Sequence, residues 1–168
     1  WDYVNRHVTL SIDGYVLRGL QHLAELLDLN TKGKPKRLKH APSKHTAPKY
    51  GAKVQYAKEP DTSEPLSKER IKLLMEIIGV FLFYARAIDN TMLVSLGTLG
   101  SAQSKGTDNT MQAAVHLLNY AATHPDAMIR YHASEMQLHT HSDASYLSES
   151  EARSRAGGYF FLDGKDDP

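Results

Sequence analysis

A run of alternating histidine and aspartate residues near the C-terminus has the residue types that bind metals. His139-Thr140-His141-Ser142-Asp143 places two imidazoles and one carboxylate two residues apart. Residues two apart on a β-strand point to the same face. Two imidazoles and a carboxylate on one face can bind a transition metal such as zinc. A half-exposed polar strand face gives the same pattern, and we favour that plainer interpretation.

Asp143 by itself suggests a different metal chemistry. We expect it at the end of a strand, because the small residues Ala144 and Ser145 and then a turn follow it. A carboxylate in that position suits Mg²⁺, which prefers oxygen ligands and keeps several waters. One carboxylate cannot hold a catalytic pair of magnesium ions, so further carboxylates would be needed. Without further context, Asp143 is better interpreted as the start of a turn.

Two clusters of charge are candidates for binding phosphate. The Ser148–Arg155 stretch is a charged loop whose arginines, Arg153 and Arg155, either are solvated or contact nucleic acid. The second cluster, from Leu29 to Lys58, has no acidic residue and nine basic ones. We predict phosphate binding mainly from its first five cations, because such a block releases counterions from polyanions. These five are Lys32, Lys34, Lys36, Arg37 and Lys39.

Composition excludes several other classes of site. The chain has no cysteine, so a disulfide framework, a thiolate metal site and a cysteine nucleophile are excluded. An intracellular setting is therefore favoured. No apolar run approaches the roughly 18 residues that a bilayer-spanning helix needs, so we expect no membrane association. Arg86 and Asp89, three residues apart at a helix end, predict a local ion pair of structural value.

The first elements expected along the chain are a strand and a helix. His7–Ile12 alternates like a short strand. Apolar residues spaced three and four apart then predict a helix from Gly14 to Leu29, capped by Ser11 or Asp13. The proline-rich stretch 30–66 reads as an extended connector.

The sequence from Ser67 onward predicts three helices followed by strands. Ser67 caps the most amphipathic helix, which runs to about Ile88 and should be central to the core. A second helix covers 91–104, where glycines permit close packing, and a third covers 109–123 behind Thr107 or Asp108. Strands are expected at 127–131, 135–141 and 159–162, the first two joined by a short turn. Helices followed by a meander predict an α+β fold, with a composition shift near Pro125.

Four stretches, taken in order, resemble the polymerase-to-ribonuclease H region of copia-type LTR retrotransposon polyproteins. The first match is an expected strand and helix, and the second is a hydrophobic helix that ends in Tyr-Ala. The third is another helix, and the fourth combines two short stretches near the C-terminus. Ile12 stands where the family usually has Gln, and Arg86 and Asp89 are spaced differently from the family's Thr-Arg-Pro-Asp. The stretches are His7–Ser11 with Gly14–Val16, Ile77–Ala85, Gln103–Thr107 with Ala114–Tyr120, and Ser142–Tyr146 with Ser154–Tyr159.

The resemblance implies three segments. Residues 1–66 would be the palm end, the entrance to the thumb and the basic connector. Residues 67–125 would be thumb or connection helices, and 126–168 the first antiparallel strands of a ribonuclease H-like sheet. Asp143 would be the first of four ribonuclease H carboxylates and a ligand of Mg²⁺ in the complete parent enzyme.

The sequence therefore predicts a fragment that binds an RNA–DNA hybrid or other nucleic acid. It lacks the polymerase's Tyr-x-Asp-Asp motif and three of the ribonuclease H carboxylates, so we expect it to be inactive alone, with the rest of the polyprotein as a partner. The abrupt ends at Trp1 and Pro168 also suggest a fragment. The family's setting is a cytoplasmic virus-like particle or the nucleus. The alternative is a non-catalytic, domesticated or degenerate, nucleic-acid-binding module.

Overall fold

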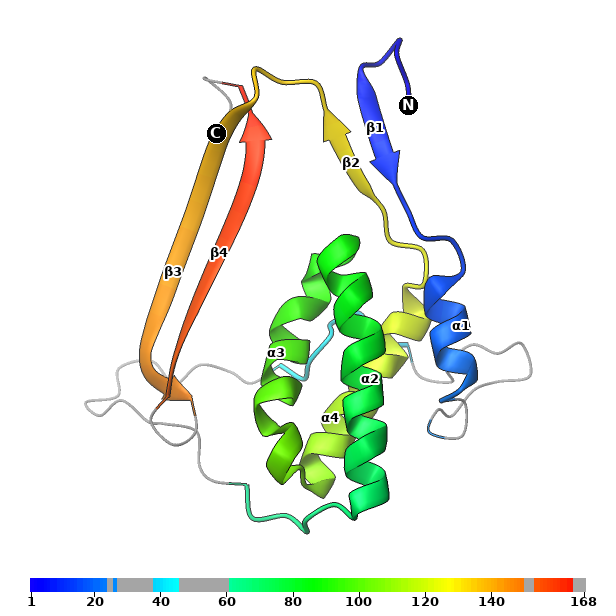
Figure 1. The fold of residues 1–168 in the computed structure, drawn as a ribbon, viewed down its shortest axis with the longest axis vertical. Coiled ribbons are helices and arrows are strands. Elements are labelled where there is room, and N and C mark those ends of the chain that lie inside the picture. The colour runs from blue at the N-terminus through cyan, green and yellow to red at the C-terminus, as the bar shows by residue number, and fades with distance from the viewer. Residues whose placement is uncertain (24–25, 27–37, 46–60, 150–152, 165–168) are drawn as a thin grey trace. The chain divides into compact units, whose positions relative to one another are not determined.

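The computed structural model describes residues 1–23, 26, 38–45, 61–149 and 153–164 (Figure 1). The fold is α+β, as expected, with two separate two-stranded sheets, β1–β2 and β3–β4. In chain order the elements are β1 (His7–Leu10), α1 (Tyr15–Gln21), α2 (Lys68–Ala87), η2 (Asn90–Met92), α3 (Leu93–Ala102), η3 (Gln103–Lys105), α4 (Asp108–Thr123), β2 (Ile129–His132), β3 (Gln137–Glu149) and β4 (Arg153–Asp163).

The chain divides into two compact units that are not contiguous in sequence. The helical unit comprises residues 9–46 and 63–129, and the strand unit comprises 1–8, 47–62 and 130–168. This division differs from the three consecutive segments expected from the sequence. The difference arises because β1, near the N-terminus, pairs with β2, which follows the last helix.

The hydrophobic core belongs entirely to the helical unit. Among the described residues, every buried apolar side chain lies between Val16 and Ala121. Helix α2 is central, as predicted, and Ser67 caps it by accepting a hydrogen bond from the backbone N–H of Arg70. Burial of each large aliphatic or phenyl side chain on its inward face contributes about 1.5–3 kcal/mol. The buried residues of the helix are Leu74, Ile77, Ile78, Phe81, Tyr84 and Ala85.

The starts of α2 and α4 are fastened together by backbone contacts. The Leu66 N–H donates to the carbonyl of Gly106 (2.9 Å), and the Asp108 N–H donates to the carbonyl of Glu64 (2.9 Å). Thr107 caps α4 in a reciprocal capping box with Thr110, which confirms one of the two expected caps. These contacts satisfy amide groups that a helix start leaves without partners.

Helix α1 is shorter than predicted and begins differently. Its N-cap is Gly14, at φ +66°, and no side chain caps it. The expected caps, Ser11 and Asp13, instead hydrogen bond to each other (2.8 Å). The α-helix ends at Gln21 rather than Leu29, and most of the residues between those positions lie outside the described ranges.

The region of α3 matches the predicted helix 91–104, but its glycines do not serve close packing. A Cβ atom placed on Gly97 or Gly100 would meet no neighbouring atom within 4 Å. The close approach occurs at Gly106, where a Cβ would lie 3.0 Å from Leu66 Cδ1 and 3.2 Å from Leu74 Cδ2.

The predicted three-strand meander is confirmed for the pairing of its last two strands and is wrong for the first. Strand β2 pairs with β1, and the Ala133 N–H donates to the carbonyl of Arg6 (2.8 Å), which keeps the chain beside the N-terminal segment. Met136, at φ +60°, then interrupts the extended backbone before β3. Strands β3 and β4 form a long antiparallel hairpin of their own (Figure 1).

Across the described ranges, none of the helices combines the length and the apolar content that crossing a bilayer requires.

Candidate nucleic-acid interface

The β3–β4 hairpin brings together the candidate residues of the C-terminal region. Its register places His139 opposite Phe161, His141 opposite Tyr159, and Asp143 opposite Gly157. Because directly opposed residues share a face and side chains alternate along each strand, these residues lie on one face. We call this the ring face and define it by His139, His141, Asp143, Arg153, Arg155, Tyr159 and Phe161.

Four aromatic rings form a continuous cluster on the ring face. Phe161 stands at its centre, nearly parallel to both histidines, with ring centroids 5.2 Å from His139 and 5.5 Å from His141. Tyr159 lies 5.3 Å from Phe161 at a tilt of 32°. Such offset contacts are favourable beyond simple burial. The sequence analysis did not predict this cluster because the expected meander fixed no register between the strand of His139 and that of Tyr159.

Asp143 lies within β3, not at the end of a strand as expected. The pairing continues past it through Ala144, opposite Ala156, and Ser145, opposite Arg155. Its carboxylate is exposed, and Oδ1 accepts a hydrogen bond from the Ala144 N–H (2.8 Å). A Cβ on the opposing Gly157 would meet nothing within 4 Å, so the space beside the carboxylate is open.

The histidines and Asp143 share a face, as the alternation predicted, but do not form a metal centre. Both histidine rings pack on Phe161, and His139 Nε2 lies 3.2 Å from the carbonyl oxygen of Gly164. Within the described ranges, no three His, Asp or Glu side chains are placed to hold one ion. Asp143 therefore offers one oxygen ligand rather than a complete site.

The two candidate arginines lie on β4 and not in a loop. Arg153 is exposed and Arg155 half-buried, and both interact with other groups of the chain. Arg153 pairs with Glu149 across a bulge that separates it from the regular register at Ser145. Alternation along β4 places both arginines on the side of Tyr159 and Phe161.

Of the five candidate cations of the basic segment, Lys39 alone lies within the described residues; Lys32, Lys34, Lys36 and Arg37 lie outside them. The Lys39 N–H donates to Thr123 Oγ1 (3.1 Å) at the end of α4. Next to it, His40 Nδ1 lies 3.2 Å from His124 Nε2. These contacts hold the chain that follows the basic segment against α4.

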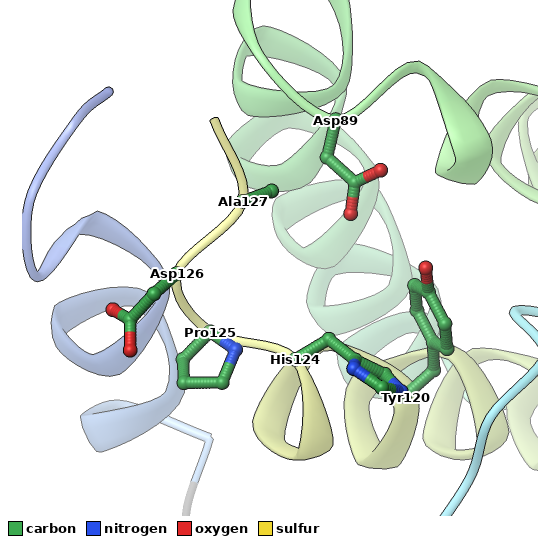
Figure 2. A pocket seen from close by; sticks show the side chains of 6 residues that line it. All are labelled: Asp89, Tyr120, His124, Pro125, Asp126 and Ala127. Carbon is green, nitrogen blue, oxygen red and sulfur yellow. The ribbon is translucent and has the colours of Figure 1, made fainter. Parts of the chain in front are cut away.

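The helical unit has an open pocket of about 430 Å³ beside the end of α4 (Figure 2). The buried Asp89 lines it and accepts hydrogen bonds from the N–H (3.2 Å) and Oγ1 (2.5 Å) of Thr91. The expected ion pair with Arg86 is therefore wrong, because the carboxylate is turned inward to cap η2. The other lining residues are Tyr120, His124, Pro125, Asp126 and Ala127.

Tyr84 fixes the chain that lines this pocket. Its hydroxyl donates to the carbonyl of Pro125 (3.4 Å) and accepts from the Ala127 N–H (3.2 Å). Burial raises the pKa of Tyr84 above its usual value, and the nearby carboxylates of Asp89 and Asp126 act in the same direction. Two acidic residues, Asp89 and Asp126, line the pocket, which makes it poorly suited to phosphate.

Comparison of the chain with protein-family models, with curated proteins and with solved structures found no match.

Proposed function

We propose that this chain is the connecting region of a copia-type reverse transcriptase and ribonuclease H, and that it contributes nucleic-acid binding. One observation carries the proposal. The two stretches that resemble the start of ribonuclease H, around Asp143 and around Gly157, are separate in sequence and pair with each other in one hairpin. That pairing is what the first two antiparallel strands of a ribonuclease H-like sheet require.

The hairpin also needs further structure to complete a sheet. Two-stranded ribbons are marginal alone and gain stability from a third strand or a covering helix. Large apolar side chains of the hairpin are exposed, including Leu138 (68%) and Phe160 (65%). Both features are expected of strands that belong to a larger ribonuclease H-like domain.

Binding would depend on two groups of cations. The basic segment supplies Lys32, Lys34, Lys36, Arg37 and Lys39, and the ring face supplies Arg153 and Arg155. Lysine and arginine neutralise phosphates without reading sequence, so the expected ligand is defined by its backbone rather than its bases. An RNA–DNA hybrid is the ligand that connects the two activities of the parent enzyme.

In the complete parent enzyme, Asp143 would hold Mg²⁺, which supplies charge stabilisation for phosphoryl transfer when several carboxylates bind it. The exposed carboxylate and the open space at Gly157 are compatible with one such ligand. We propose that this chain binds the hybrid and leaves cleavage to the complete ligand set.

The test is the affinity of the chain for a short fluorescein-labelled RNA–DNA hybrid, measured by anisotropy at fixed salt. Three variants are compared: one with Lys32, Lys34, Lys36, Arg37 and Lys39 all changed to Gln, one with Arg153→Gln and Arg155→Gln, and a control. The control is Lys68→Gln with Lys72→Gln, which removes two exposed cations from α2.

We expect both candidate variants to bind at least about tenfold more weakly, since each lost phosphate contact removes released counterions. The α2 control should bind like the unmodified chain. Equal affinities for all four proteins, or the largest loss in the control, would contradict the proposal.

A further inference from the structure

We propose that the ring face of the β3–β4 hairpin is a stacking platform for unpaired bases of single-stranded nucleic acid. This inference rests on the proposed function and deepens it, because it assigns a second kind of nucleic-acid ligand to the same hairpin. It arises from the four-ring cluster, which neither the motifs nor the proposed metal ligand explains.

The first support is the geometry of the rings. Phe161 is half-buried and nearly parallel to His141 (5°) and to His139 (18°), so the planes of the three rings are similarly oriented. Tyr159 extends the cluster along β4 and is 55% exposed. Every base has a π face, so aromatic platforms bind single strands with little sequence preference. Rings already packed against one another lose little freedom when a base stacks on them.

The second support is the position of the arginines. Along β4 the ring face reads Arg153, Arg155, Gly157, Tyr159 and Phe161. Because the cations lie at one end of this row and the rings at the other, the phosphates of a single-stranded nucleic acid can contact the arginines while its bases stack on the rings. Gly157 lies between them and adds no side chain on β4, and the exposed carboxylate of Asp143 lies opposite it on β3.

The opposite face of the same hairpin provides contrast. Leu138, Phe160 and Leu162 lie there with Thr140 and Ser142, so this face has apolar area but no cation. Phosphate would find no counter-charge on it. The ring of Phe160 covers Gly158, where a Cβ would lie 3.0 Å from Phe160 Cε2. The adjacent residues Phe160 and Phe161 therefore lie on opposite faces, so a substitution at one position tests one face without changing the other.

The experiment places a tryptophan on each face in turn. Trp1 is the chain's sole tryptophan, so Trp1→Phe gives a silent background. In that background Phe161→Trp reports the ring face, and Phe160→Trp is the matched control. Each protein is titrated with a single-stranded oligonucleotide, with the same oligonucleotide lacking its bases, and with the RNA–DNA hybrid. Tyr159→Leu and Phe161→Leu, which keep apolar volume and remove the ring, are measured alongside Phe160→Leu.

We expect the single strand to quench the tryptophan at 161, because a stacked base contacts its ring, and not the tryptophan at 160. The abasic strand should bind without quenching. Tyr159→Leu and Phe161→Leu should each weaken binding of the single strand about tenfold, and Phe160→Leu should leave it unchanged. Quenching at 160 as strong as at 161, or equal binding of normal and abasic strands, would overturn the inference.

The two proposals fail in distinguishable ways. Loss of the stacking signal with retained, lysine-dependent hybrid binding would reject the platform alone. Failure of every protein to bind either ligand would reject the proposed function. Concentration-dependent self-association that is abolished by Phe161→Leu, without binding of the single strand, would instead identify the ring face as a protein contact and overturn the inference.

Discussion

Asp143 faces Gly157 across the β3–β4 hairpin, so its carboxylate is bordered by a residue without a side chain. The Ala144 N–H donates to its Oδ1, and no ion pair holds it among the described residues. An exposed carboxylate of this kind contributes little to stability. Its environment therefore gives it little role in folding, which is compatible with the ligand role proposed above.

The first prediction concerns that carboxylate. Asp143→Asn should leave the thermal unfolding of the chain unchanged, because the group is exposed and structurally dispensable. The purified chain with Mg²⁺ should not cleave the RNA of a hybrid, since one carboxylate cannot hold a catalytic metal pair. A labelled hybrid on a denaturing gel reads the outcome. Cleavage that Asp143→Asn abolishes would show that the chain already has a working active site.

The glycines of the helical unit should respond in opposite directions to alanine. Gly97→Ala adds a methyl group in open space within a helix and should raise the free energy of unfolding by about 0.5–1 kcal/mol. Gly106→Ala would press on Leu66 and Leu74 and should lower it by about 1–3 kcal/mol. Urea unfolding followed by far-ultraviolet circular dichroism compares the two. Destabilisation by Gly97→Ala would mean that α3 packs against something at this position.

Much of this helical unit is predictable from sequence, and the reason is local. Ser67 and Thr107 cap their helices as expected because a cap is set by a few adjacent residues. The pairing of β2 with β1 was not predicted, because it joins residues far apart in the chain. No feature of the neighbouring sequence shows that β2 pairs with β1 rather than with the next strand along the chain.

The candidate site was predictable only in part for the same reason. Alternation correctly placed His139, His141 and Asp143 on one face. It did not reveal that Phe161 packs against both histidines, since those contacts depend on the register of β3 against β4. The inward turn of Asp89 was also missed, although Asp89 followed by Thr91 is typical of a capping turn.

Tyr84 supplies a pH-dependent test of the pocket wall. Tyr84→Phe should lower the free energy of unfolding by about 1 kcal/mol near neutral pH, because the Pro125 carbonyl and the Ala127 N–H lose a partner. The raised pKa of Tyr84 means that the folded chain holds this proton more tightly than the unfolded chain. Its contribution is therefore complete below the ordinary tyrosine pKa of about 10 and is lost as pH rises beyond it.

The measurement compares unfolding of the unmodified chain and of Tyr84→Phe at about pH 8 and about pH 11. Because the substitution removes the titrating group, the stability difference between the two proteins should shrink at the higher pH. A difference that grows instead would indicate that the hydroxyl ionises more easily in the folded chain.

The most direct test of nucleic-acid binding is the salt dependence of hybrid affinity for the unmodified chain. The logarithm of the association constant should fall linearly with the logarithm of salt concentration. Seven candidate cations imply a slope of about −4 or steeper when most of them contact phosphate. A slope shallower than about −1, or no binding even at low salt, would contradict the account.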